Sequence, residues 1–196
     1  MKKMKLMVAI GLISLTTSPL FAQQKNTDAQ VQTDTIIIIR GPEKTIAAIA
    51  DNISYNDAVE ALKSKQFVLE ADKVIFRNGY AAYVNTNTNF VMEDNDKSTV
   101  QVAFNNGFSG PNGIGGVTVE GMASHNRMQV DKKGNVNYSF STMGSGLSAR
   151  IVITLYAGGN NARVDVLPNF SSNTLSLTGK IIPLDQSNFF KGTVSY

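Results

Sequence analysis

The chain has 196 residues, with 18 lysines and arginines against 15 aspartates and glutamates. Three of the lysines lie within its first five positions, so the chain after them carries no net charge. That balance removes the bulk attraction that nucleic acids and anionic membranes require, and we expect no nucleic-acid partner and at most peripheral membrane association. Cysteine is absent and His125 is the single histidine, which excludes thiol catalysis, cysteine-ligated zinc, iron–sulfur clusters and histidine-rich metal sites.

The N-terminal segment is typical of a secretory signal peptide. Lys2, Lys3 and Lys5 precede an apolar run over 6–15, and a short exit follows that ends at Ala22. Because the run is shorter than a membrane-spanning helix needs, it predicts cleavage near Ala22 rather than a retained anchor. We therefore expect residues 1–22 to be removed and the chain to be exported to the periplasm or cell envelope.

Two segments are expected between the cleavage site and the main domain. Residues 23–34 are polar and predict a linker, and residues 35–63 predict an N-terminal extension. Within the extension, the four isoleucines Ile36–Ile39 predict a strand packed against the protein, because such a run would aggregate if it were exposed. What this strand is for does not follow from the sequence.

One or two short helices are expected next. The tripeptide Gly41-Pro42-Glu43 is a helix start, with proline at a first helical position and an acid in the first turn. Ser54, followed by Asp57, is a weaker second start. After it an apolar stripe recurs at helical spacing, which indicates a helix face packed against a sheet, and the stripe is Tyr55, Ala58, Val59 and Leu62.

From residue 64 to residue 196 the pattern predicts an all-β domain. Apolar side chains alternate with polar ones in run after run, as in Val100 and Val102, Val136 to Phe140, Ile151 to Leu155, Val164 and Val166, and Leu175 and Leu177. Turn signals separate the runs, at Asn78-Gly79, 131–135 and 158–161. This predicts eight to ten antiparallel strands in a barrel or a two-sheet sandwich, which share the same alternation.

The glycine-rich stretch FSGPNGIGGVTVE (108–120) overlaps loose phosphate-loop patterns. A Walker loop needs a lysine followed by a hydroxyl residue and must open a helix. Here Gly115 and Gly116 are followed by an alternating run that starts at Val117. We therefore expect these glycines to supply positive φ or close backbone approach at a turn, bulge or barrel corner, and we expect no bound cofactor.

The acidic run over 93–98 fails the EF-hand pattern, because glycine is missing at the sixth position and glutamate at the twelfth, and it predicts a solvated hairpin turn without a metal. A glycosidase needs two carboxylates across a cleft, and Glu70, Glu93 and Glu120 are the candidates that lie in or beside strands. Nothing in the sequence pairs them, and tryptophan is absent.

The remaining chemistry-bearing residues form no recognisable constellation. Ser145 and Ser148 lie near glycines, but Ser145 lacks the glycine two residues before it that a nucleophile elbow requires. His125 lies near a strand end, where a surface or turn histidine is expected. We predict no catalytic, cofactor-binding or metal-binding residue. A small outer-membrane barrel is a further alternative, against which stand strands of about five to eight residues and the lack of aromatic girdles.

Over about residues 64–192 the chain resembles a family of exported envelope proteins described as domain of unknown function 4251. The resemblance is carried by KQFVLEADKV (65–74), NTNFVMEDND (87–96), STVQVAF (98–104), PNGIGGVTVEG (111–121), DKKGNVNYSF (131–140), LSARIVITL (147–155), NARVDVLPNF (161–170) and LTGKIIPLDQSNFFKG (177–192). It implies one all-β domain behind a signal peptide and assigns no catalytic residue.

Taken together, these observations predict a non-enzymatic envelope domain that binds a small apolar or amphiphilic ligand, or another envelope protein, since a barrel or sandwich offers a mouth or cavity. Two alternatives stay open. One is a hydrolase of envelope polysaccharide that uses a carboxylate pair, with Glu120 as one member. The other is a purely structural component. The identity of the ligand and the oligomeric state do not follow from the sequence.

Overall fold

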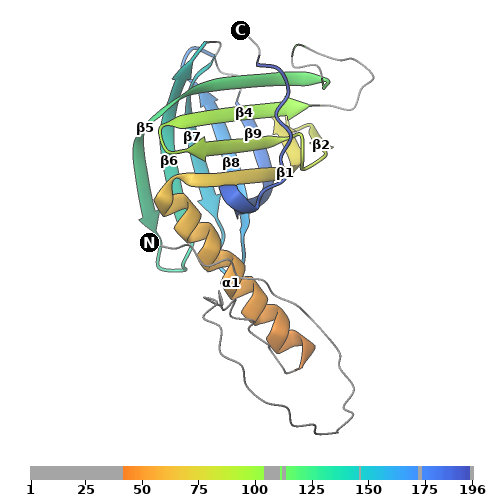
Figure 1. The fold of residues 1–196 in the computed structure, drawn as a ribbon, viewed down its shortest axis with the longest axis vertical. Coiled ribbons are helices and arrows are strands. Elements are labelled where there is room, and N and C mark those ends of the chain that lie inside the picture. The colour runs from red at the N-terminus through yellow and green to blue at the C-terminus, as the bar shows by residue number, and fades with distance from the viewer. Residues whose placement is uncertain (1–41, 104–110, 112–113, 146, 172–173, 195–196) are drawn as a thin grey trace, which may run out of the picture. The chain divides into compact units, whose positions relative to one another are not determined.

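The computed structural model describes residues 42–103, 111, 114–145, 147–171 and 174–194. Residues 48–196 form one compact unit and residues 1–47 form another, of which the start of a helix is described. The expected linker over 23–34 and the expected strand Ile36–Ile39 lie outside the described residues. The elements in chain order are α1 (Glu43–Ser64), β1 (Gln66–Phe76), β2 (Ala81–Tyr83), β3 (Phe90–Asp94), β4 (Lys97–Ala103), β5 (Gly116–Val130), β6 (Val136–Gly144), β7 (Leu147–Leu155), β8 (Asn161–Pro168), β9 (Leu175–Pro183) and the 3-10 turn η1 (Leu184–Gln186) (Figure 1).

Helix α1 is a single helix of 22 residues. It begins at Glu43, as the Gly-Pro-Glu signal predicts, but Ser54 does not begin a second helix. The hydroxyl of Ser54 instead donates to the carbonyl of Asp51 at 2.9 Å within α1. The segment from 43 to 64 contains no glycine or proline that would interrupt the helix. Within the described residues, no helix combines the length and apolarity that crossing a bilayer requires.

The strands form a closed barrel. Each strand from β3 to β9 pairs antiparallel with the next in the chain, β1 pairs with β3, and β1 also pairs with β9 from Phe67–Pro183 to Phe76–Leu175. That last pairing closes eight strands on themselves, so the protein is a barrel and not a two-sheet sandwich. The short strand β2 pairs with the second half of β1 on the side where β3 pairs with the first half.

The inward faces of the strands are those that the alternation predicts. The largest of the buried inward-facing side chains are Phe67, Leu69, Phe140, Ile151, Ile153, Leu155, Leu177 and Ile181, each no more than 1% exposed. Aromatic rings contribute edge contacts, and those of Phe67 and Tyr138 meet with their centroids 5.7 Å apart and their planes at 88°. An eight-stranded barrel is just wide enough for side chains to fill it or for one small ligand.

The second half of α1 closes one end of the barrel. Ala58 and Leu62, from the predicted apolar stripe, have no exposed surface and belong to the same apolar cluster as the inward-facing strand residues. The hydroxyl of Tyr55 donates to the carbonyl of Gly134 in the turn between β5 and β6. We call this the helix end of the barrel. The β3–β4, β5–β6 and β7–β8 turns lie there, because β1 starts there directly after α1.

The glycines before β5 act as the sequence predicts. Gly115 has φ of +92°, a backbone conformation that favours glycine. At Gly116 a Cβ atom would lie 1.8 Å from the carbonyl oxygen of Val102 on β4, so the two strands approach too closely for any side chain. A strand and not a helix follows, which removes the phosphate-loop interpretation. Gly110 and Gly113 lie outside the described residues.

Candidate functional site

The three candidate carboxylates do not face one another. Glu93 points into the barrel, where it has no exposed surface. Glu120 lies on the outer face and forms an ion pair with Lys191 at 2.6 Å. Glu70, also on the outer face, accepts a hydrogen bond from Ser187. The barrel wall separates Glu93 from the other two, so the predicted hydrolase pair that includes Glu120 is not formed among these residues.

His125 and the two serines are equally dispersed. His125 lies in a bulge of β5 between Ser124 and Arg127, with φ of +56°, and its exposed ring contacts the Ser124 hydroxyl at 3.1 Å. Ser148 lies on β7 and receives a hydrogen bond from Asn169 at 2.8 Å. Ser145 is exposed in the turn after β6. No nucleophile–base–acid arrangement connects them, and no group of three or more metal-ligating side chains occurs in the described part of the chain.

A polar cluster lies inside the barrel near the helix end. Asn126 Nδ2 donates to Glu93 Oε1 at 2.5 Å and to Tyr138 Oη at 2.6 Å, and Tyr138 Oη donates to Glu93 Oε2 at 2.9 Å. The three residues come from β3, β5 and β6, so the cluster joins three strands. Among the described residues, Glu93 is the only charged side chain that is buried.

The β5 bulge is what brings Asn126 inside. The register of β5 against β6 shifts between Ser124 and Arg127, so one extra residue reverses the alternation. β4 pairs with β5 only as far as Lys97–Met122. The rest of β5 pairs with β6 but no longer with β4. The hydrogen bond from Asn126 to Glu93 connects this part of β5 to β3.

Burial dominates the electrostatics of this cluster. It raises the pKa of Glu93 above the ordinary value of 4.5, although the hydrogen bonds from Tyr138 and Asn126 and the charge of Lys65 act in the opposite direction. Burial and then the Glu93 carboxylate raise the pKa of Tyr138 as well. A carboxyl with a raised pKa suits general acid catalysis, but Glu93 has no exposed surface, and its side-chain partners are Asn126 and Tyr138 rather than a second carboxylate. We therefore interpret the cluster as structural, because its hydrogen bonds hold β3, β5 and β6 together inside the barrel.

At the opposite end of the barrel, the apolar side chains of several described strand ends are partly exposed. Here the inward-facing side chains of four strand ends are Phe76, Val102, Val117 and Leu175, and the ring of Tyr80 stacks on Phe76 at 6.0 Å between centroids. Val117 is 45% exposed and Tyr80 64% exposed. We call these five residues the mouth. At the helix end the inward-facing Val136, Leu155 and Ile181 have no exposed surface, whereas Val130, which pairs with Val136, is 59% exposed.

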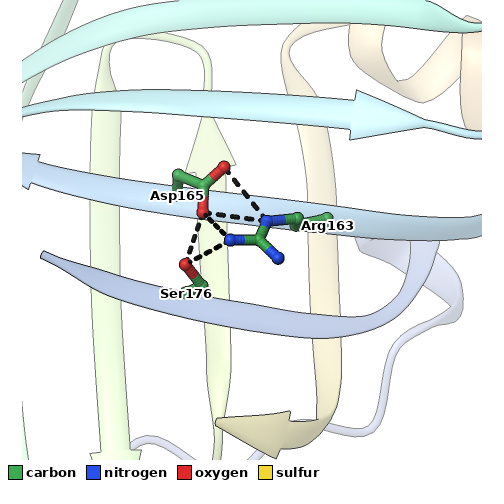
Figure 2. Close-up of polar contacts among 3 residues, drawn as sticks. All are labelled: Arg163, Asp165 and Ser176. Carbon is green, nitrogen blue, oxygen red and sulfur yellow. Dashed lines mark hydrogen bonds and ion pairs between the residues drawn. The ribbon is translucent and has the colours of Figure 1, made fainter. Parts of the chain in front are cut away.

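A second polar cluster lies on the outer face of β8 and β9 (Figure 2). The guanidinium of Arg163 donates from Nε to both carboxylate oxygens of Asp165, at 3.0 and 3.2 Å, and from Nη2 to the hydroxyl of Ser176 at 2.8 Å. Ser176 in turn donates to Asp165. Asp165 raises the pKa of Arg163. Because the three groups satisfy one another across a strand pair, we interpret the cluster as a cross-strand contact of β8 and β9.

One surface hollow of about 600 Å³ lies on α1, and its described lining is Asn56, Val59, Glu60, Lys63 and Ser64. This lining is mostly polar and lies outside the barrel, so it is not the apolar interior pocket that a barrel ligand would need. The mouth is therefore the feature of the described residues that best fits a ligand site.

The fold and the site define a closed, eight-stranded antiparallel barrel with the second half of α1 packed on one end and the apolar mouth at the other. The family model for domain of unknown function (DUF4251) matches residues 50–181, and the chain belongs to this family. It is similar to a DUF4251 family protein from Bacteroides eggerthii DSM 20697, whose crystal structure was solved at 1.95 Å. The two chains are 57% identical and match with a TM-score of 0.62, and the match covers 72% of this chain and 95% of the Bacteroides eggerthii chain. No curated protein matches the chain.

The resemblance to this family was visible in the sequence, but the polar cluster was not. The acidic run over 93–98 predicts a solvated hairpin turn, and residues 95–96 form that turn. Glu93 itself lies in β3 and shares the alternation of Val91, which was the available signal that it points inward. Asn126 carried no signal, because the bulge alone places it inside. Tyr138 was recognised as a buried strand residue but not as a hydrogen-bond donor to a carboxylate.

Proposed function

We propose that this protein is a non-enzymatic domain of the cell envelope that binds a small apolar or amphiphilic ligand at the mouth. The observation that carries the proposal is that four inward-facing apolar side chains and the ring of Tyr80 gather there with part of their surface exposed, Val117 at 45% and Tyr80 at 64%. Small barrels commonly bind ligands at their mouths, where apolar walls bury the ligand and a few polar groups orient it.

Two further contacts support an amphiphilic ligand in particular. The stacked rings of Phe76 and Tyr80 offer a flat apolar face beside the tyrosine hydroxyl. On the adjoining outer face, the Lys73 ammonium lies 5.9 Å from the centre of the Tyr83 ring, and Tyr83 is 87% exposed. A ligand with an apolar body and a polar head would meet both kinds of surface at this end of the barrel.

The test is a fluorescence titration of residues 23–196 with N-phenyl-1-naphthylamine, an uncharged apolar probe, followed by displacement with decanol. We expect saturable binding that Val117→Asp weakens at least tenfold. Val130→Asp is the matched control, because Val130 lies at the other end of β5 and is 59% exposed. Equal loss in both variants, or no saturable binding at all, would contradict the proposal and favour a structural component or a protein partner.

The export of the chain is part of the same proposal. It is supported by the charged start, apolar run and Ala22 exit of the sequence. Expression of the full chain in a Gram-negative host, followed by cell fractionation and N-terminal sequencing, tests it directly. We expect a periplasmic product that begins at residue 23. A cytoplasmic product that keeps Met1 would contradict the assignment.

A further inference from the structure

The segment after β9 lies across the outside of the barrel as a strap, which we define as residues 184–194. It begins with the single 3-10 turn η1 and then crosses the outer faces of β1, β3, β4 and β5 (Figure 1). It pairs with no strand as part of a ladder. Its position therefore depends on contacts outside any ladder, most of them made by side chains, and these extend over four strands.

The central contact is the side-chain amide of Gln101, which has no exposed surface. Its Nε2 donates to the carbonyl of Phe190 at 2.7 Å and to that of Thr88 at 3.0 Å. Its Oε1 accepts from the amide of Gly192 at 2.8 Å and from the hydroxyl of Thr118 at 2.7 Å. All four hydrogen-bonding capacities of the amide are used, two of them by the strap.

The geometry of this contact copies a β-ladder. In a parallel pair, one residue bonds to the carbonyl before and to the amide after the residue opposite it. Gln101 does the same for the residues on either side of Lys191, with a side-chain amide in place of a backbone one. The main-chain amide of Phe190 is bound as well, by the carbonyl of Asn87 at 2.7 Å. This face thus recognises an extended backbone.

Side chains add selectivity to the backbone recognition. The ring of Phe189 packs on that of Phe90, with 4.8 Å between centroids, and Lys191 pairs with Glu120 at 2.6 Å. Phe90 has no exposed surface, although it points outward. The face therefore fits an extended segment that carries an aromatic residue two positions before a cation.

We propose that this outer face of β3, β4 and β5 is a docking site that also takes the strap of a second copy of this chain. A second copy supplies the required aromatic residue, cation and backbone, and exchange replaces every contact by an identical one. The strap is connected covalently to the barrel through Pro183, the last residue of β9, and Phe190 is 57% exposed. Its own strap competes at an effective concentration of about a millimolar, so exchange grows with protein concentration.

The chain lacks cysteine, so engineered cysteines can report where the strap lies. The hydroxyl of Ser187 lies 2.5 Å from Glu70 Oε1. The experiment mixes full-length Glu70→Cys chains labelled with ¹⁵N and unlabelled Ser187→Cys chains, and it measures the disulfide between labelled and unlabelled chains by mass as the protein concentration rises. In the matched control, Lys132→Cys in the exposed β5–β6 turn replaces Glu70→Cys. A double variant, Glu70→Cys with Ser187→Cys, reports docking of the strap within one chain.

We expect the mixed disulfide to exceed the Lys132→Cys control several-fold, to increase with concentration, and to fall to the control level when Gln101→Glu is added to the labelled chain. If the double variant closes within one chain while the mixed disulfide stays at the control level at every concentration, the strap serves only its own barrel and the proposal is wrong. If the double variant does not close, the strap does not dock on this face and the proposal is also wrong.

Discussion

Tyr138 and Glu93 lie 45 residues apart on strands that are not neighbours in the barrel, and the tyrosine hydroxyl donates to the carboxylate at 2.9 Å across the interior. Asn126 completes the cluster from the bulge of β5. Each member satisfies a polar group that burial would otherwise leave costly. The cluster therefore gives testable consequences for stability.

Replacing Glu93 by glutamine should remove a pH dependence of stability. Because burial raises the folded-state pKa of Glu93 above 4.5, wild-type stability is greatest below the unfolded-state pKa and is lost as the pH rises through the folded-state pKa. Glutamine resembles the protonated acid. We expect the melting temperature of Glu93→Gln, minus that of the wild type, to increase from pH 4 to pH 8 in thermal denaturation. Glu120→Gln, on the outer face, should show no such increase, and parallel curves for Glu93→Gln would contradict the prediction.

Tyr138→Phe should destabilise the protein by about 1–3 kcal/mol, because it leaves the ring packing against Phe67 intact but withdraws a hydrogen bond from a buried carboxylate. Urea denaturation measures the change in the free energy of unfolding. Tyr83→Phe serves as control, since Tyr83 is 87% exposed, and it should stay within about 0.5 kcal/mol of the wild type. Equal effects of both changes would show that the hydroxyl of Tyr138 contributes nothing.

Gly116→Ala should cost about 1–3 kcal/mol, because the new Cβ would lie 1.8 Å from the backbone oxygen of Val102 and two paired strands would have to separate. The same denaturation measurement applies. In Gly159→Ala the Cβ would meet only the side chain of Asn161, at 3.7 Å, so this control should be close to neutral. A stable Gly116→Ala variant that lost probe binding would show that the glycines form a functional loop.

Gln101→Glu should release the strap. The change withdraws both donors from the carbonyls of Thr88 and Phe190 and sets a carboxylate against them at a site with no exposed surface. We expect limited proteolysis with trypsin to cut after Lys191 at least several-fold faster than in the wild type. Gln129→Glu, an exposed position on β5, should leave the rate unchanged. Equal rates in all three proteins would mean that Gln101 does not hold the strap.

The local pattern of the sequence was enough to predict most strands, because alternation and turn chemistry act between near neighbours. Val136, Tyr138 and Phe140 point inward as expected, and glycines with positive φ lie in the turns at Gly79, Gly134 and Gly158. The start of α1 was likewise predicted by the proline and acid around residue 42. Family membership followed from segments of the sequence spread over the same strands.

Three features were decided only by the tertiary structure. The closure of the barrel depends on the pairing of β1 with β9, about a hundred residues apart in the chain, and alternation is the same in a barrel and a sandwich. The position of Asn126 depends on a bulge that shifts the period by one residue. The partners of Glu93 come from β5 and β6, and the strap covers Gln101. The sequence by itself determined which faces of the strands are apolar, since that is a property of neighbouring residues, whereas the partners of the buried polar groups come from distant segments that only the folded chain brings together.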